Sequence, residues 1–396
     1  MVPSAKSSRS STLPFVIACC ILLIGAEVFA YRYTRNPAHW NDFRAFYTAG
    51  YILRTQPSQL YDLALQQSVQ NRITSDNGIF IPYYHPSYEA ILFAGLSYVS
   101  FAKALGIFMA LGVVCMVASF YAARVLFSDR IPWLQAWPGQ MLVLFLPAVG
   151  AIFWGQDSML FFLVFCLAWR QMERDNDLSA GVVLGLALFR FQLAIPLAIL
   201  IAVRRGRRFA TGFVIAGIAI LLLSGVLIGT QGLMTMAHLL THASLATDQG
   251  FHAQQLMKVH PTQMPNLTGL LYVVITRHLH PTLGFAVVAC ASVALLIFTG
   301  VRIRRAANNS IALALALLCS VLLSYHMFPY DLTILLPAFA IVALDYPRTV
   351  FGLYWLPVVL YLTLGSHSIF LYAIALLGLL FYLGLVKSKE PASLAG

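Results

Sequence analysis

The chain alternates long hydrophobic runs with shorter polar segments along almost its whole length. An apolar helix of about 20 residues crosses the hydrocarbon core of a bilayer and satisfies its own backbone hydrogen bonds there. The pattern therefore predicts about twelve transmembrane helices, several of them shorter than a straight crossing needs, as tilted, broken or cavity-lining helices are. The runs cover residues 13–31, 87–100, 104–127, 141–153, 159–169, 180–203, 209–228, 283–301, 310–325, 332–344, 350–364 and 369–386.

The polar segment 32–84 separates the first two runs and carries many Tyr, Phe and Trp residues, which are typical of a membrane interface. Apolar residues recur at helical spacing from Asn41 to Arg54, and Asn41 suits an N-cap. We therefore expect an amphipathic helix along the membrane surface there, and a second one from Gln59 to Arg72. A basic N-terminus before the first run also suits a signal peptide, but that run is long enough to span and lacks a clear cleavage site.

Basic residues gather in short clusters beside the runs, and such clusters mark the cytoplasmic side of a membrane protein. The strongest clusters are residues 204–208, 302–305 and 387–389. Placing them and the N-terminus inside sends the loops 32–84 and 230–282 outside, provided that residues 267–275 do not cross. Two weaker clusters, 124–130 and 170–174, then fall outside against the rule. We predict a multi-pass membrane protein whose loops 32–84 and 230–282 lie on the extracytoplasmic side.

Composition excludes a water-soluble protein. Hydrophobic residues make up 60% and charged residues 10% of the 396 positions, with a mean hydropathy of +0.80. The formal charge of +11 does not indicate nucleic-acid binding, because the basic residues follow the topology. We predict one all-α membrane domain over residues 1–396. Its parts are the first transmembrane helix at 13–31, an outer loop at 32–84, the rest of a catalytic module at 85–229, an outer loop at 230–282 and C-terminal transmembrane helices at 283–386.

The sequence lacks the spacing of a metal site or a disulfide framework. Its six cysteines lie inside apolar runs without paired spacing. His238 and His242 have the i, i+4 spacing of zinc ligands, but no glutamate or cysteine completes a set such as H-E-x-x-H. No P-loop, dinucleotide-binding glycine pattern or nucleophile elbow is present. We therefore expect no metal and no cofactor.

Asp42 places a carboxylate at the membrane edge, in the first polar segment after the first run. Ionisable groups at such positions are costly and need a partner or a task. Three roles are open from position alone. Asp42 can lie at a helix N-terminus, where the dipole stabilises it. It can pair with Arg44 or Arg35, or it can act as a general base.

Arg190 lies midway along the run 180–203, where a guanidinium is costly unless it meets an anion. Its fork of N–H groups matches a phosphate, which favours a lipid-phosphate contact. The alternative is a buried structural partner such as Asp157. Gln192 offers a further hydrogen bond to the same ligand or to a neighbouring helix.

Two polar interruptions complete the set of candidates. Gly155-Gln156-Asp157-Ser158 separates two apolar runs, either as a tight turn with a capping Asp157 or as a polar re-entrant point that lines a cavity. His326 lies in a turn on the outer side, as Asp42 does. There it is either a satisfied polar group or a donor to a phosphate or a sugar hydroxyl.

Several of these motifs, taken in their order and spacing, resemble glycosyltransferase family 87 (DUF2029) of the GT-C superfamily. The resemblance covers residues 40–340. It rests on Asp42-Phe43 with Tyr47 and Ala49-Gly50, Leu60-Tyr61-Asp62, Tyr84-His85-Pro86, Gly155-Gln156, Gly181 to Gly185 with Arg190-Phe191-Gln192, and His326 with Tyr330-Asp331.

This resemblance implies a GT-C fold and a polyprenyl-phosphate-sugar donor. It also implies a general base at Asp42 and a histidine near the donor phosphate at His326, while Arg190 stands where many members have lysine. The chain departs from the family at His85, where proline is frequent, and at Asp157, where asparagine or a hydrophobic residue is usual. The expected donor-phosphate ligands are Arg190, His326 and Gln192, and the expected substrate contacts are Tyr47, Tyr84, His85, Gln156, Asp157 and Tyr330.

The chemistry of the residues agrees with such a transfer. A sugar hydroxyl is too weak an acid to attack unaided, so a carboxylate such as Asp42 must take its proton. The leaving lipid phosphate needs cationic or hydrogen-bonding donors, and Arg190 and His326 can supply them. One displacement assisted by one carboxylate inverts the anomeric carbon. We expect a hexosyl residue, with mannose as one possibility, to move to a lipid or glycan acceptor.

Two other classes stay open. A transporter also has many spans and buried charges, but related halves with paired broken helices are absent from the sequence. A non-catalytic protein that binds polyprenyl phosphate would keep Arg190 but tolerate the loss of Asp42.

Overall fold

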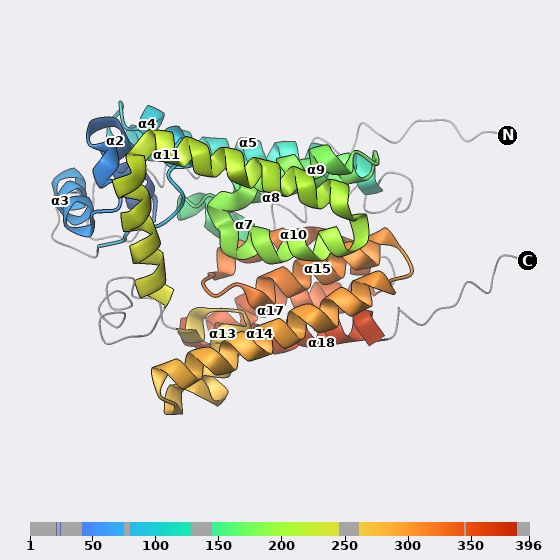
Figure 1. Cartoon of the computed structure of the whole chain (residues 1–396). Coiled ribbons are helices and arrows are strands. Elements are labelled where there is room, and N and C mark those ends of the chain that lie inside the picture. Colours follow the sequence, from blue (N-terminus) through green and yellow to red (C-terminus); the bar gives the residue numbers. More distant parts are fainter. Residues whose placement is uncertain are drawn as a thin grey trace, which may run out of the picture. The chain divides into compact units, whose positions relative to one another are not determined.

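The computed structural model describes residues 21, 24, 42–74, 80–127, 145–244, 261–343 and 346–385. Every regular element in these ranges is helical, which confirms the all-α prediction (Figure 1). The predicted first transmembrane helix, 13–31, lies outside the described residues except at two positions. The described chain forms two compact units, one within residues 1–175 and 223–233 and the other within 176–222 and 234–396.

The first unit contains the elements around Asp42. They are α2 (Phe43–Thr55), the 3-10 turn η1 (Pro57–Gln59), α3 (Leu63–Thr74), α4 (Ala90–Leu96), α5 (Phe101–Phe127), α7 (Leu146–Phe153), α8 (Ser158–Met172) and the middle of α11 (Arg207–Ser244). Helix α2 confirms the helix predicted from Asn41 to Arg54, and α3 overlaps the second predicted helix. However, ten of the 13 residues of α2 are buried, so in this structure it packs within the unit.

Aromatic side chains hold α2 against α4. The Phe46 and Phe93 rings stack with their centroids 4.7 Å apart, and Phe43 meets Phe93 edge to face at 6.1 Å. The two backbones approach so closely at Gly50 that a Cβ atom there would lie 2.2 Å from the carbonyl carbon of Phe93. Next to this pair, α5 packs along α8 (Figure 1). The packing fixes the segment that carries Asp42 on a rigid base.

The second unit contains the segment around Arg190. Its elements are α9 (Asp177–Gly185), η2 (Leu186–Arg190), α10 (Phe191–Arg205), η3 (Pro261–Gln263), α13 (Leu267–Val274), η4 (Thr276–His278), α14 (Pro281–Arg304), α15 (Asn309–Leu323), η5 (Pro329–Leu335), α16 (Leu336–Ala343), α17 (Pro347–Leu364), η6 (Ser366–Leu371) and α18 (Tyr372–Leu385), with the two ends of α11. Helix α15 is buried over most of its length and contacts α10, α14, α16 and α18. It is the core of this unit.

The predicted run 180–203 is a helix with a break. A 3-10 turn, η2, separates α9 from α10, and Arg190 itself has non-helical backbone angles (φ −107°, ψ 56°). Irregular backbone at membrane depth occurs where it is buried in protein or lines a cavity. The break therefore places Arg190 where its guanidinium and the freed backbone can be satisfied within the protein.

The described residues contain five helices that are long and apolar enough to cross a membrane: Phe101–Ala123, Asp177–Arg205, Arg207–Leu239, Pro281–Arg304 and Ser366–Leu385. Four shorter apolar helices accompany them. These findings support a helical membrane protein but not the count of about twelve crossings, which stays a prediction together with the GT-C fold. The run 87–100 forms only the seven residues of α4, and α13 has eight residues, too few for a crossing.

Candidate functional site

Asp42 lies immediately before α2 and is held by a side chain from a distant part of the first unit. Its backbone carbonyl accepts the Ala45 amide N–H, as expected at the start of a helix, but its carboxylate makes no capping bond. Instead, the Gln156 side-chain amide donates a hydrogen bond to Asp42 Oδ2. The two residues are 114 positions apart in the sequence. A hydrogen bond from this amide orients the carboxylate.

The turn between α7 and α8 explains how Gln156 reaches Asp42. Gly155 has φ +62°, a left-handed conformation that costs glycine little and reverses the chain in few residues. The Gln156 amide N–H donates to Ala151 O at 2.8 Å, which closes the turn. Asp157 then precedes α8 but makes no side-chain cap bond. The predicted turn is present, while the predicted capping role of the Asp157 carboxylate is not.

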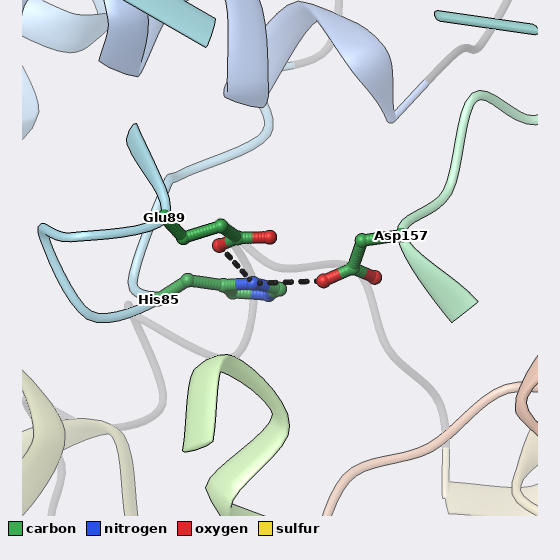
Figure 2. Close-up of side chains that lie close together, drawn as sticks. All are labelled: His85, Glu89 and Asp157. Atoms are coloured by element: carbon green, nitrogen blue, oxygen red, sulfur yellow. Dashed lines mark hydrogen bonds and ion pairs between the residues drawn. The ribbon is translucent and has the colours of Figure 1, made fainter. Parts of the chain in front are cut away.

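The Asp157 carboxylate belongs to a buried cluster with His85 and Glu89, which Figure 2 shows. His85 Nδ1 lies 2.8 Å from Glu89 Oε2 and 3.4 Å from Asp157 Oδ2. The exposed fractions are 8%, 5% and 0% for His85, Glu89 and Asp157. Three ionisable side chains at such burial are costly unless they compensate one another.

Burial and the neighbouring charges shift the protonation of this cluster. Burial by itself lowers the pKa of the His85 imidazole, but the carboxylates of Glu89 and Asp157 outweigh it and raise that pKa to about 9. Burial raises the pKa of the Glu89 carboxyl above its ordinary value. The first shift favours the protonated imidazole of His85, and the second favours the neutral carboxyl of Glu89.

Two tyrosines fix the segment that carries His85 and Glu89. The Tyr83 hydroxyl contacts both Pro86 O, at 3.0 Å, and Glu89 Oε2, at 3.2 Å. The Tyr61 hydroxyl donates to the backbone carbonyl of His85 at 2.8 Å. Gln66 adds bonds to the backbone of Tyr83. The cluster is therefore preorganised by buried hydrogen bonds.

Arg190 in the second unit has a carboxylate partner that the sequence did not suggest, Asp331. Arg190 Nη1 lies 3.1 Å from Asp331 Oδ1, and both residues are 3% exposed. The Arg190 guanidinium carbon also lies 6.0 Å from the centre of the Tyr330 ring. Asp331 Oδ2 also accepts the Phe328 amide N–H at 3.0 Å, which caps the start of η5.

The other predicted phosphate ligands, His326 and Gln192, lie a few residues along the chain from Asp331 and Arg190, respectively. His326 is half-buried, and its ring meets the Phe328 ring edge to face at 5.3 Å, with Tyr330 following at 5.4 Å from Phe328. Gln192 is buried near the start of α10, two positions after Arg190. His326 is thus connected to Arg190 by a series of contacts through the rings of Phe328 and Tyr330.

Two predicted substrate contacts have structural roles in the first unit. The Tyr47 hydroxyl donates to Val99 O at 2.7 Å, and its ring packs against Phe101. Tyr84 is half-buried and lies edge to face against the His85 ring at 5.4 Å. Among the predicted site residues of the first unit, Asp42 contacts Gln156, and His85 contacts Asp157.

Glu89 is the residue of this site that sequence reasoning missed. Its signal is present in the sequence, because Glu89 follows His85 at the i, i+4 spacing and is a rare charged residue at the start of an apolar run. The proline between them directs attention to a helix start instead.

Comparison with known proteins gives one match. The family model of glycosyltransferase family 87 matches residues 83–329, more than half of the 396 residues. No protein of curated function and no solved structure matches the chain. The matched segment contains Tyr84, His85, Gln156, Asp157, Arg190, Gln192 and His326, while Asp42, Tyr47 and Tyr330 lie outside it.

Proposed function

Since the chain belongs to glycosyltransferase family 87 and has apolar helices long enough to span a membrane, it is a membrane glycosyltransferase, and we propose its reaction as follows. It transfers a hexosyl residue, with mannose as the first candidate, from a polyprenyl-phosphate donor to a lipid or glycan acceptor. The transfer inverts the anomeric carbon and takes place on the extracytoplasmic face of the inner membrane. A lipid donor accounts for a sugar-handling site within a membrane domain.

The observation that carries this proposal is the contact of Asp42 with Gln156. A general base must be charged, oriented and within reach of the hydroxyl that it deprotonates. The side-chain amide of Gln156 donates a hydrogen bond to one carboxylate oxygen of Asp42 and so orients the carboxylate. Asp42 then takes the proton of the acceptor hydroxyl while the hydroxyl oxygen bonds to the anomeric carbon and the phosphate leaves with its bonding electrons.

In this proposal the leaving phosphate is bound by Arg190, His326 and Gln192. Arg190 carries a positive charge that one carboxylate, Asp331, already offsets, so a phosphate would share or replace that partner. His326 and Gln192 would add hydrogen bonds to phosphate oxygens. The residues proposed to shape the substrate contacts are Tyr84, His85 and Asp157. Tyr47 and Tyr330 are proposed to contribute through their packing.

Donor specificity tests the proposed function directly. We expect purified full-length protein in lipid vesicles to transfer radiolabelled mannose from polyprenyl-phosphate-mannose to membrane lipids, and not from a nucleotide sugar. Chromatography of the lipid products measures both. Transfer from the nucleotide sugar but not from polyprenyl-phosphate-mannose would contradict the proposed donor. Counterflow of polyprenyl phosphate without any sugar transfer would favour the transporter class instead.

Gln156 should affect catalysis through Asp42. Replacing it by Leu keeps the side-chain size but removes the donor to the carboxylate, and hydrogen bonds to charged groups contribute about 1.5–3 kcal/mol. We expect Gln156→Leu to lower kcat about 10- to 100-fold with little change in the KM for the donor. Steady-state assays of the variant measure the two constants separately.

The matched control is Gln67→Leu, the same change at an exposed position of α3. Its kcat should equal that of the wild type. An increase in donor KM alone in Gln156→Leu would show that Gln156 binds substrate rather than positions Asp42.

A further inference from the structure

We propose that His85, Glu89 and Asp157 form a binding site for a divalent cation of the Mn²⁺ or Zn²⁺ type. This goes beyond the proposed transfer reaction and replaces the expectation, drawn from the sequence, that the protein binds no metal. Each residue offers one ligand atom, and these atoms all lie within 4.8 Å of one another. Imidazole nitrogen with carboxylate oxygen is a donor set that suits Zn²⁺ and Mn²⁺.

The spacing of the donor atoms fits one ion. Neighbouring ligands at about 2.1 Å from a metal lie about 3.0 Å apart in an octahedron and about 3.4 Å apart in a tetrahedron. His85 Nδ1 lies 2.8 Å from Glu89 Oε2 and 3.4 Å from Asp157 Oδ2. Small rotations of the side chains therefore suffice to place a cation among the three groups.

Two carboxylates converge on a single ring nitrogen, as Figure 2 shows. A protonated Nδ1 carries one hydrogen, which can point at one carboxylate at its best geometry. A cation, in contrast, is attracted by both carboxylates and by the lone pair of the neutral imidazole. A cation at this position would therefore be attracted by both carboxylates at once.

Glu89 supplies the second, independent observation. Its side chain is 2% exposed, and within the described part of the chain Oε1 has no hydrogen-bond partner. A buried carboxylate oxygen without a donor is costly. A metal ion that Glu89 binds through both oxygens satisfies Oε1 as well.

Hydrogen bonds from neighbouring residues preorganise the proposed metal site. Tyr83 contacts Glu89 Oε2, and Tyr61 holds the backbone carbonyl of His85. Such outer contacts orient the ligands of metal sites. Asp157 directly follows Gln156, the residue that donates to Asp42. A cation at Asp157 would therefore also stiffen the turn that presents Gln156.

Metal content tests the site without reference to sugar transfer. Full-length protein is stripped with a chelator, loaded with Mn²⁺ or Zn²⁺ in separate samples, freed of excess metal and analysed by elemental mass spectrometry. We expect the wild type to retain about one metal ion per chain, and Glu89→Gln to bind at least about tenfold more weakly because it removes a charged ligand. The control is Glu173→Gln, the same change at an exposed glutamate beyond α8, which should match the wild type.

A second measurement guards against misfolding of the variant. Bound metal should raise the Tm of the wild type and of Glu173→Gln, but not that of Glu89→Gln, whose Tm without metal shows whether it is folded. Wild-type protein that retains neither metal after loading would overturn the proposal, whatever the variant does. Equal retention by Glu89→Gln and the wild type would overturn it too. Neither result changes the outcome expected in the donor assay, so the metal site and the proposed reaction are tested independently.

Discussion

Asp42→Asn is expected to lower the rate of sugar transfer about 10²- to 10⁴-fold, the share of catalysis that a well-placed general base supplies. The asparagine side chain has nearly the same shape but cannot take a proton from the acceptor hydroxyl. Because Asp42 makes no capping bond to α2, the helix should form as before. The measurement is transfer from polyprenyl-phosphate-mannose in vesicles at matched protein content.

Asp62→Asn is the matched control for this variant. Asp62 lies in the same segment, and its carboxylate accepts the Ala64 and Leu65 amide N–H groups at the start of α3. Asparagine keeps that acceptor, so transfer should stay at the wild-type level. Full activity in Asp42→Asn would remove Asp42 from the role of base, and wild-type protein that binds the donor but transfers nothing would favour a non-catalytic lipid-binding protein.

Asp331→Asn should strongly destabilise the second unit. It removes the Asp331 carboxylate from its buried ion pair with Arg190, and removing one partner of a buried ion pair costs about 3–5 kcal/mol of unfolding free energy. Thermal unfolding in detergent should show a clear fall in Tm. Asp177→Asn is the control, because Asp177 pairs with Arg205 at 3.5 Å in a more exposed position and should change the Tm little.

A double variant separates the structural role of Arg190 from its proposed role in donor binding. Arg190→Met with Asp331→Leu replaces both charges by apolar groups, which is often neutral for stability. We expect its Tm to recover toward the wild-type value, while the KM for the polyprenyl-phosphate donor rises at least about tenfold because a phosphate contact is lost. An unchanged donor KM in this folded variant would leave Arg190 a purely structural residue.

The sequence by itself determined the class of the protein and its local elements. Runs of apolar residues demand helices in a membrane, and every regular element in the described part of the structure is a helix. Helical spacing placed α2 correctly, and Gly155 with its polar neighbours marked the turn before α8. The order of several short motifs was enough to indicate the family that the family model then matched. The helices and the turn depend on neighbours within a few residues, and so a single sequence records them.

Only the tertiary structure decided which side chains meet. Asp42 and Gln156 are 114 positions apart, and Arg190 and Asp331 are 141 apart. In a chain with so many apolar helices, hydrophobic periodicity shows that each helix has partners but not which helices they are. The sequence therefore did not show that Asp331 pairs with Arg190, or that Asp157 lies with His85 and the overlooked Glu89. The physical reason is that charges buried among apolar helices must compensate one another, and packing decides which of them come within reach.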